Sequence, residues 1–365
     1  MAAIAPSNRL RRTPFSTGVE RSGVTAYTVY NRMLLPAVFE SLSDDCAHLK
    51  EHVQVWDVAC ERQISVQGPD AGRLMALLTP RDLSKMAADQ CYYVPMVDTN
   101  GGMLNDPVAV KHSENHYWIS IADSDLLLWV KGVAAGMGLN VRVSEPDVSP
   151  LAVQGPLADE LLARIFGDAV RDIRFFRYKR LPFQGRDLVI ARSGYSKQGG
   201  FEIYVEGRDI GMELWDALFA AGQDLNVRAG CPNLIERIEG GLLSYGNDMT
   251  ADHTPFDCGL GKFVNSDADY IGRAALEKAR SDGAKWRLCA IEISGDPVPA
   301  CDRHWAITMN GQTIGQVTSA TWSPDQKLNV AIGMVQAERF AIGADVEVET
   351  QDGIRNARLR AEFWN

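Results

Sequence analysis

The sequence lacks the cysteine patterns that mark metal centres and disulfide frameworks. Its seven cysteines are scattered, with no Cys-x-x-Cys pair and no cysteine–histidine cluster at metal-ligand spacing. We therefore expect buried, reduced thiols, as in the cytoplasm. His48 and His52 stand four residues apart, but no glutamate follows the first of them. Because a zinc-protease motif requires that glutamate, we expect a solvated or capping role rather than a metal site.

Positive charge and long apolar runs are also scarce. The chain has 37 basic against 47 acidic residues, a net charge of −10, and no basic face with interleaved aromatics. Nucleic acid and anionic membranes are therefore poor partners. No apolar run is long enough to span a bilayer, and no apolar segment of the signal-peptide type follows the arginines near the N-terminus. These absences predict a cytoplasmic protein that binds neither nucleic acid nor membrane, and a homodimer is compatible with them.

Two phrases of the sequence recur in the same order. Ile64–Leu78 reads as a short strand, a Gly-Pro break and a helix, and the same phrase returns at Leu151–Ile165. The pairs Gly101-Gly102 and Gly199-Gly200 are each followed by a strand-like run and later by a helix. At 365 residues and 46% hydrophobic, the chain can form two or three domains. The recurrences predict two similar α/β lobes.

The character of the chain changes after residues 281–285. Strand-like runs separated by Gly, Asn and Asp predict a small β-barrel or sandwich at the C-terminus. These runs are 287–293, 305–309, 313–319, 328–335 and 346–349.

The stretch Arg192–Gly207 carries the clearest candidate site. Phe201, Ile203 and Val205 alternate with Glu202, Tyr204 and Glu206, so a strand here would direct the first set to the core and the second to the opposite face. If that face lines a cavity, Glu202 offers two acceptor oxygens to a ligand edge with two parallel N–H donors, such as a pterin ring. The alternative is an edge strand with a solvated glutamate.

Taken together, phrases along nearly the whole chain resemble the glycine-cleavage T-protein (aminomethyltransferase) family, which binds folate. The resemblance rests on Trp56–Val58, Val66–Gly68, Tyr93 eight residues before Gly101-Gly102, Asn105-Asp106, Gly194–Glu202, Arg237 and Glu239 with Tyr245–Asp248, and Gly315–Pro324. It implies an α+β fold, a three-domain ring of two related α/β lobes and a C-terminal β-barrel around a channel that holds tetrahydrofolate. The boundaries expected are 1–52 plus 147–280 for the folate-binding lobe, 53–146 for the second lobe and 284–365 for the barrel.

The resemblance also implies site roles. Glu202 resembles the carboxylate that holds the pterin, and Tyr93 resembles an aromatic wall beside it. Asp106 matches the second of two acidic family positions, and Asn105 stands where the first would be. Arg237 falls in the same cofactor-binding set. An amide cannot act as the base that aminomethyl transfer uses, so Asn105 is a departure from the family pattern.

A second departure is Asn233, which occupies a position where the family often has arginine. Arg228 or Lys262 could replace that charge. Other phrases resemble a branch of the family that moves a methyl group from a small sulfonium compound to tetrahydrofolate. They are Leu10–Phe15, Cys91–Pro95, Arg174–Tyr178, Ser196–Glu202 and Cys231–Asn233.

Methyl transfer from a sulfonium needs alignment rather than a metal or a covalent nucleophile. Aromatic faces hold a cation without fixing it as firmly as a carboxylate would. Tyr195 and Tyr204 flank Glu202 and are the first candidates for such a cage, with Asp106 as the third catalytic candidate. Further substrate-binding candidates, whose alternatives are core packing or solvation, are Tyr30, Phe176, Tyr178 and, for a substrate carboxylate, Lys197 or Arg174.

Three functions are compatible with these residues. The first is a folate-dependent demethylase of a small onium compound. The second is an aminomethyltransferase or methylamine demethylase of the same fold, and Asn105 and Asn233 argue against the former. The third is a non-catalytic folate-binding module, whose branch carries a Lys-Gly-Cys-Tyr phrase where this chain has Ser193-Gly-Tyr-Ser-Lys.

Overall fold

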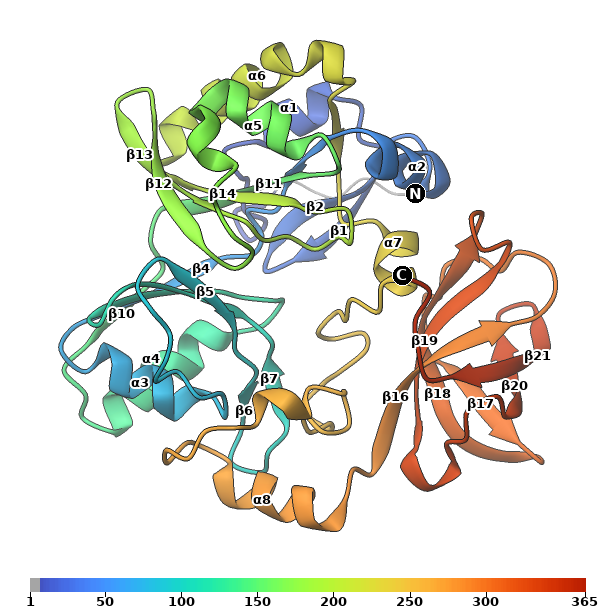
Figure 1. Cartoon of the computed structure of the whole chain (residues 1–365). Helices are drawn as coiled ribbons and strands as arrows, with labels where there is room; N and C mark the ends of the chain where they lie inside the picture. Colours follow the sequence, from blue (N-terminus) through green and yellow to red (C-terminus); the bar gives the residue numbers. More distant parts are fainter. Residues whose placement is uncertain (1–6) are drawn as a thin grey trace.

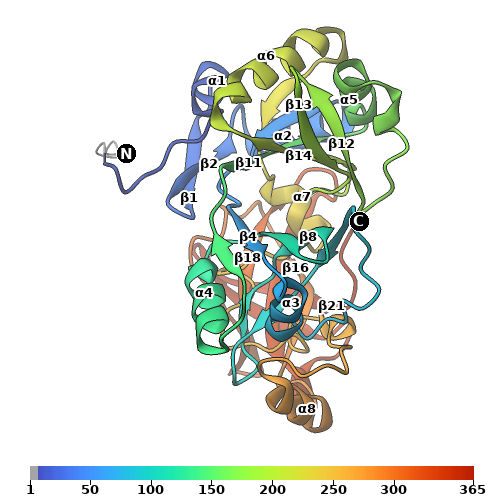
Figure 2. The same ribbon diagram turned by 90° about the vertical axis from the view of Figure 1, so that its left-hand side faces the viewer.

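Three lobes surround a common centre in the computed structural model, which describes residues 7–365 (Figure 1). The first six residues of the predicted first lobe lie outside that range. We name the lobes by their sheets: the first lobe has a six-stranded sheet, the second a five-stranded sheet, and the third is a closed barrel. A view turned by 90° shows the first lobe above the other two (Figure 2). The predicted α+β class and three-lobed arrangement are confirmed.

The first lobe contains residues from both ends of the second. Its elements are α1 (Ser16–Arg21), β1 (Ala26–Tyr30), β2 (Met33–Val38), α2 (Leu42–Glu51), β3 (Gln54–Asp57), β11 (Val148–Gln154), α5 (Ala158–Phe166), β12 (Tyr178–Phe183), β13 (Arg186–Ala191), β14 (Gly200–Glu206), α6 (Gly211–Ala221) and β15 (Arg228–Gly230). The strand order is β12-β13-β14-β11-β3-β15. Leu161 of α5 and Leu218 of α6 pack with Ile203 in one apolar core, so the two helices cover one face of the sheet.

The second lobe is smaller and continuous in sequence. Its elements are β4 (Gln63–Gln67), α3 (Ala71–Leu78), β5 (Gln90–Tyr93), β6 (Met96–Val97), β7 (Met103–Asn105), β8 (Val108–Ser113), β9 (His116–Ser120), α4 (Leu126–Gly136) and β10 (Arg142–Ser144). The main sheet has the order β10-β4-β9-β8-β5, and β6 pairs with β7 separately. Leu74 of α3 and Val130 of α4 pack with Ile119 in its core.

The two lobes share one connectivity, as the repeated Gln-Gly-Pro phrase predicts. In each main sheet the first strand of the unit lies beside the last of its antiparallel meander, and a strand after the second helix forms the far edge. In the second lobe this strand, β10, pairs directly with β4, whereas in the first lobe β3 lies between β11 and β15. Gly68 and Gly155 follow the first strands with φ of 143° and 118°, where a side chain would collide with a neighbouring carbonyl. The Gly-Gly pairs are not equivalent, because Gly102 precedes β7 outside the main sheet whereas Gly200 begins β14.

One predicted boundary differs from the structure. The predicted second lobe, 53–146, includes strand β3. In the structure β3 pairs with β11 and β15 and so belongs to the first lobe. Sequence pattern identifies a strand without identifying its partner, so β3 could not be assigned. The exchange between lobes lies between Asp57 and Gln63, and the chain returns between Ser144 and Val148. The other boundaries stay predictions.

The barrel closes in the order β16-β19-β18-β17-β20-β21. Its strands are β16 (Trp286–Ile293), β17 (Trp305–Met309), β18 (Gln312–Ser323), β19 (Leu328–Gln336), β20 (Asp345–Thr350) and β21 (Gly353–Arg360), and α7 (Leu234–Glu239) and α8 (Arg273–Asp282) precede it. Five strands were predicted. β21 was missed because arginines alternate with small and apolar residues along it, and charged residues are unfavourable for strand prediction. Short 3₁₀ turns lie at Asp168–Val170, Arg208–Ile210, Gln223–Leu225, Gly261–Phe263 and Ala337–Arg339.

The helix-free faces of the two sheets meet between the lobes. Trp118 of β9 and Tyr204 of β14 lie in one buried apolar cluster, with ring centroids 6.0 Å apart. Glu202 therefore belongs to a central strand with both faces covered, and the edge-strand alternative is wrong. Within residues 7–365, no helix is both long and apolar enough to cross a membrane.

The free, mostly buried cysteines agree with the expectation of reduced thiols, but His48 is not solvated as expected. All seven cysteines are free, and six are buried. His48 is buried rather than solvated: its Nε2 lies 2.8 Å from the Asn226 carbonyl, and burial lowers its pKa to about 4. Among the described residues, no group of three or more His, Cys, Asp or Glu side chains is arranged to hold a metal ion.

Candidate active site

Glu202 presents one carboxylate oxygen to the centre of the molecule. The hydroxyls of Ser193 and Tyr204 donate to its Oε2 at 2.5 and 3.3 Å. Neither donates to Oε1. Burial raises the pKa of Glu202, although the two hydroxyls lower it. The side chain is 9% exposed, so the site holds a nearly buried carboxylate with one oxygen available to an external donor.

Asp106 and Tyr93 form a second acceptor near the same centre. The Tyr93 hydroxyl donates to Asp106 Oδ2 at 2.9 Å, and both side chains are half-buried. Tyr93 ends β5, and Asp106 follows β7, so both come from the second lobe. Burial raises the pKa of Asp106 to about 7, although the Tyr93 hydrogen bond lowers it. This carboxyl group can therefore exchange a proton near neutral pH.

Glu61 is a third acid of this centre, and sequence reasoning missed it. It lies in the loop between β3 and β4 and is half-buried. Burial and the negative charges of Glu202 and Asp106 raise its pKa well above the usual value. No periodic pattern or family phrase marks a single loop glutamate. Its position after Trp56-Asp57-Val58 was the one signal available.

Tyr30 reaches the same acids from a tight hairpin. Asn31 and Arg32 have φ of 48° and 63°, as a two-residue β1–β2 turn requires. The Asn31 amide donates to the carbonyls of Cys60 and Ala122 at 2.9 and 3.3 Å. Burial, followed by the charge of Glu61, raises the pKa of the Tyr30 phenol well above the usual value. The turn thus fixes Tyr30 beside Glu61.

Tyr195 completes what we call the central cluster: Tyr30, Glu61, Tyr93, Asp106, Tyr195 and Glu202. Its hydroxyl donates to the Leu242 and Leu243 carbonyls at 3.0 and 2.7 Å, and its ring is half-buried. Burial raises its pKa, and the charges of Asp106 and Glu61 contribute. The cluster combines three carboxyl groups with three phenol rings, a composition suited to N–H donors and to cations.

Two predicted cofactor-binding residues, Asn105 and Arg237, form hydrogen bonds and an ion pair within the protein. The Asn105 amide is fully buried, donates to Ala122 O and Ser124 Oγ at 3.1 and 2.8 Å, and accepts from Ala122 N. Arg237 pairs with Asp248 at 2.9 Å and with Ser319 Oγ at 2.5 Å. Their part in binding the cofactor stays a prediction. Spacing along the chain does not reveal which polar groups are already satisfied.

The second departure from the family pattern also has a structural role. Asn233 caps α7 by accepting from the backbone of Ile235 and Glu236 at 2.9 and 3.2 Å. Its amide nitrogen donates to Leu42 O at 2.9 Å, which ties α7 to the start of α2. Asn233 is therefore a capping residue.

Three of the predicted aromatic site residues, Tyr204, Tyr178 and Phe176, pack in or against the apolar cluster between the two sheets. Tyr204 has no exposed surface, and Tyr178 is buried with its hydroxyl 2.9 Å from His112 Nδ1. Phe176 packs against the buried apolar cluster between the two sheets, which contains Tyr178 and Tyr204. In this structure Tyr204 and Tyr178 cannot offer a ring face to a substrate, because the packing of two sheets covers them. Lys197 is exposed, and its backbone N–H donates to Glu236 at 2.9 Å; Arg174 is exposed as well.

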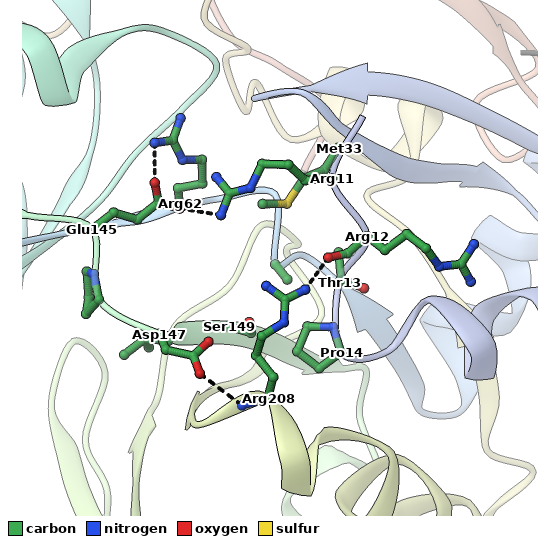
Figure 3. A pocket seen from close by; sticks show the side chains of 13 residues that line it. Arg11, Arg12, Thr13, Pro14, Met33, Arg62, Glu145, Asp147, Ser149 and Arg208 are labelled. Carbon is green, nitrogen blue, oxygen red and sulfur yellow. Dashed lines mark hydrogen bonds and ion pairs between the residues drawn. The ribbon is translucent and has the colours of Figure 1, made fainter. Parts of the chain in front are cut away.

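A small cavity lies where the chain crosses between the lobes (Figure 3). Glu145 accepts from Arg11 at 2.7 Å and from Arg62 at 2.5 Å. Burial raises the pKa of Glu145, but the hydrogen bonds from the two arginines lower it to below its usual value. Arg62 directly follows Glu61, so this ion-pair triad fixes the loop that carries Glu61.

Comparison with known proteins covers the whole chain. The family model described as the GCVT N-terminal domain matches residues 18–268, and the glycine cleavage T-protein C-terminal barrel domain matches residues 287–363. A dimethylsulfoniopropionate demethylase from Ruegeria pomeroyi is 65% identical over 364 residues, covering 100% of both chains. An aminomethyltransferase from Caldanaerobacter subterraneus is 31% identical, covering 90% of this chain and 87% of its own. The crystal structure of glycine cleavage system aminomethyltransferase T from Bartonella henselae has a TM-score of 0.86 and 23% identity, covering 98% of each chain.

Proposed function

Because this chain belongs to the glycine cleavage T-protein family, we propose that it is a dimethylsulfoniopropionate demethylase that uses tetrahydrofolate as the methyl acceptor. The full-length identity with the Ruegeria pomeroyi demethylase carries this proposal. The products are 5-methyltetrahydrofolate and methylmercaptopropionate. The enzyme is accordingly a methyltransferase.

The central cluster fits a reduced pterin. The open Oε1 of Glu202 is a charged acceptor for a ring edge with N–H donors. Asp106 supplies a second acceptor, because Tyr93 bonds only its Oδ2. The half-buried Tyr93 ring offers an apolar wall. These three residues hold the folate in the proposed complex.

The proposed reaction is a direct displacement. The methyl carbon leaves the sulfonium sulfur, which keeps the bonding electron pair, and bonds to N5 of tetrahydrofolate, which then loses its proton. The protein supplies alignment and exclusion of water, worth roughly 7–11 kcal/mol in well-oriented reactions. In the proposed reaction Asp106, whose pKa is about 7, receives the proton.

The substrate has a cationic and an anionic end. Tyr93, Tyr30 and Tyr195 are all half-buried, and with Tyr93 assigned to the pterin, Tyr30 and Tyr195 form the cage for the sulfonium; each such contact is worth about 0.5–2 kcal/mol. Lys197, exposed on the loop before β14, is the candidate for the substrate carboxylate. Tyr204 acts through Glu202, whose Oε2 its hydroxyl contacts at 3.3 Å.

Aminomethyl transfer is the second candidate, since aminomethyltransferases are among the relatives. The buried environment of Asn105 argues against it. Position 105 holds an amide and no carboxylate that could assist one-carbon assembly. That amide is also engaged by three groups of the 122–124 loop.

The proposal extends to partners and location. The ligands are a small onium compound and tetrahydrofolate, with no metal, nucleic acid or membrane. The acidic net charge of −10 supports this choice over polyanionic partners. We place the reaction in the cytoplasm.

The test uses the purified full chain with tetrahydrofolate and dimethylsulfoniopropionate, without added metal or nucleotide. Formation of 5-methyltetrahydrofolate together with methylmercaptopropionate is the expected result. Turnover of aminomethyl-lipoate in place of the sulfonium would favour the second candidate. Folate binding without methyl acceptance from any onium donor would indicate a non-catalytic folate-binding protein.

A further inference from the structure

Glu61 has a half-buried carboxylate without a protein partner. Within residues 7–365 no hydrogen bond or ion pair engages its oxygens, and only burial and the neighbouring acids Glu202 and Asp106 perturb its pKa. Glu202 and Asp106, in contrast, each accept at least one hydroxyl. A half-buried carboxylate that no protein group engages is available to a donor or a cation of a ligand.

The loop that carries Glu61 is rigid. The Glu61 N–H donates to Val58 O at 2.9 Å, and the Gln63 amide donates to Glu61 O and to Ser120 Oγ at 2.9 and 2.8 Å. Arg62 on the other side is held by Glu145, as Figure 3 shows. The backbone on both sides of Glu61 is therefore fixed.

The surroundings of Glu61 favour a cation over another donor. Tyr30 is fixed beside it through the bond from Asn31 to the Cys60 carbonyl, and the charge of Glu61 also raises the pKa of Tyr195. The Tyr30 phenol has no hydrogen bond within the described range. Aromatic rings and a carboxylate together suit an onium group, which takes cation–π contacts from the rings and a counter-charge from the acid. Glu202 and Asp106 are left for the folate.

We propose that Glu61 is the counter-charge that selects a substrate with a cationic centre over one of the same shape in which that centre is uncharged. This inference rests on the proposed function, because it assigns the substrate end of the same site. A bound sulfonium favours the ionised form of Glu61, whose pKa is raised in the free protein. The resulting negative charge stabilises the bound substrate, and that stabilisation weakens as the methyl group and the positive charge move to the folate. Glu61 thus acts on binding more than on the chemical step.

The test compares Glu61→Gln with wild type. We expect KM for dimethylsulfoniopropionate to rise about tenfold or more, with kcat unchanged or higher. Inhibition by 4-methylpentanoate, the isostere in which an uncharged CH replaces the sulfonium sulfur, should not change. Folate affinity should also stay within twofold. Glu206→Gln is the matched control, because Glu206 is not part of the central cluster. It pairs with Arg180, with 2.8 Å between the charged groups.

Other outcomes overturn the inference. An equal loss for the cation and for 4-methylpentanoate would show that Glu61 only shapes the pocket. A loss of folate affinity would assign Glu61 to the pterin, and a fall in kcat with unchanged KM would assign it to the chemical step.

If wild type does not demethylate the sulfonium, the proposed function fails while the inference keeps its own test. Calorimetric binding of 3-(trimethylammonio)propionate and 4-methylpentanoate then decides. A cation preference that Glu61→Gln removes would support the inference, and a preference that the variant retains would overturn it.

Discussion

Replacing Glu202 by glutamine should separate ligand binding from folding stability. In the wild type, Ser193 and Tyr204 donate to Oε2 and leave Oε1 open. In the variant these two hydroxyls keep the amide oxygen as their acceptor, because an NH₂ group cannot accept from them. The amide NH₂ then takes the place of Oε1. Donors of the protein would face donors of the pterin.

The size of the effect follows from the bond that is lost. A hydrogen bond to a charged group contributes about 1.5–3 kcal/mol, so tetrahydrofolate should bind roughly 10- to 150-fold more weakly. Folding should not suffer, because burial raises the pKa of Glu202 and its ionised form is unfavourable in the folded protein. The amide removes that cost, so we expect an unchanged or higher Tm.

The assay pairs a calorimetric titration with tetrahydrofolate and a thermal melt of the ligand-free protein. Glu206→Gln, on the same strand, serves as the control and should leave the folate affinity unchanged. Unchanged folate affinity in Glu202→Gln, combined with a lower Tm, would refute the reasoning. Glu202 would then be only an internal acceptor for Ser193.

Four further predictions concern charge in the site and around it. Because Asp106 must be ionised to accept a proton and its pKa is about 7, kcat should rise with pH through about 7, and Asp106→Asn should remove this rise in a pH–rate profile. Because the pKa of Asp106 is higher in the folded than in the unfolded chain, ionisation favours unfolding. As the pH rises from about 4 to 7, the free energy of unfolding of wild type should therefore fall relative to that of Asp106→Asn in denaturant titrations. Arg237→Met leaves Asp248 buried without its cation and should cost about 3–5 kcal/mol of unfolding free energy, measured by denaturant titration. Asn105→Asp loses its bond to Ala122 O and places a buried charge there, so we expect about 1–3 kcal/mol of destabilisation and no gain of aminomethyltransferase activity.

The parts of the fold that could be predicted are those in which the pattern is local. Strand β14, the recurring Gln-Gly-Pro phrase and five barrel strands show their periodicity or turn residues directly in the sequence. The pairing of β3 with β11 could not be read in this way, because the two strands are far apart in the chain. The resemblance to a family supplied the arrangement of the lobes.

The site was predictable only where family phrases covered it. Tyr93, Asp106 and Glu202 lie near one centre, but their ligand contacts stay predictions. Tyr204 alternates with apolar residues as a site residue would, yet a second sheet covers its ring. Alternation identifies a face of a strand and does not show whether ligand or protein meets that face.

The insertion of the second lobe between β3 and β11 bears on how the chain folds during synthesis. The five-stranded sheet is complete once residue 144 has left the ribosome, whereas the six-stranded sheet still needs strands as distant as Arg228–Gly230. β3 must therefore wait, without a partner, while the inserted lobe forms. A nascent chain paused between these points would carry one folded lobe and an unpaired strand, Gln54–Asp57, which is buried in the finished protein and is the segment that chaperones would have to protect.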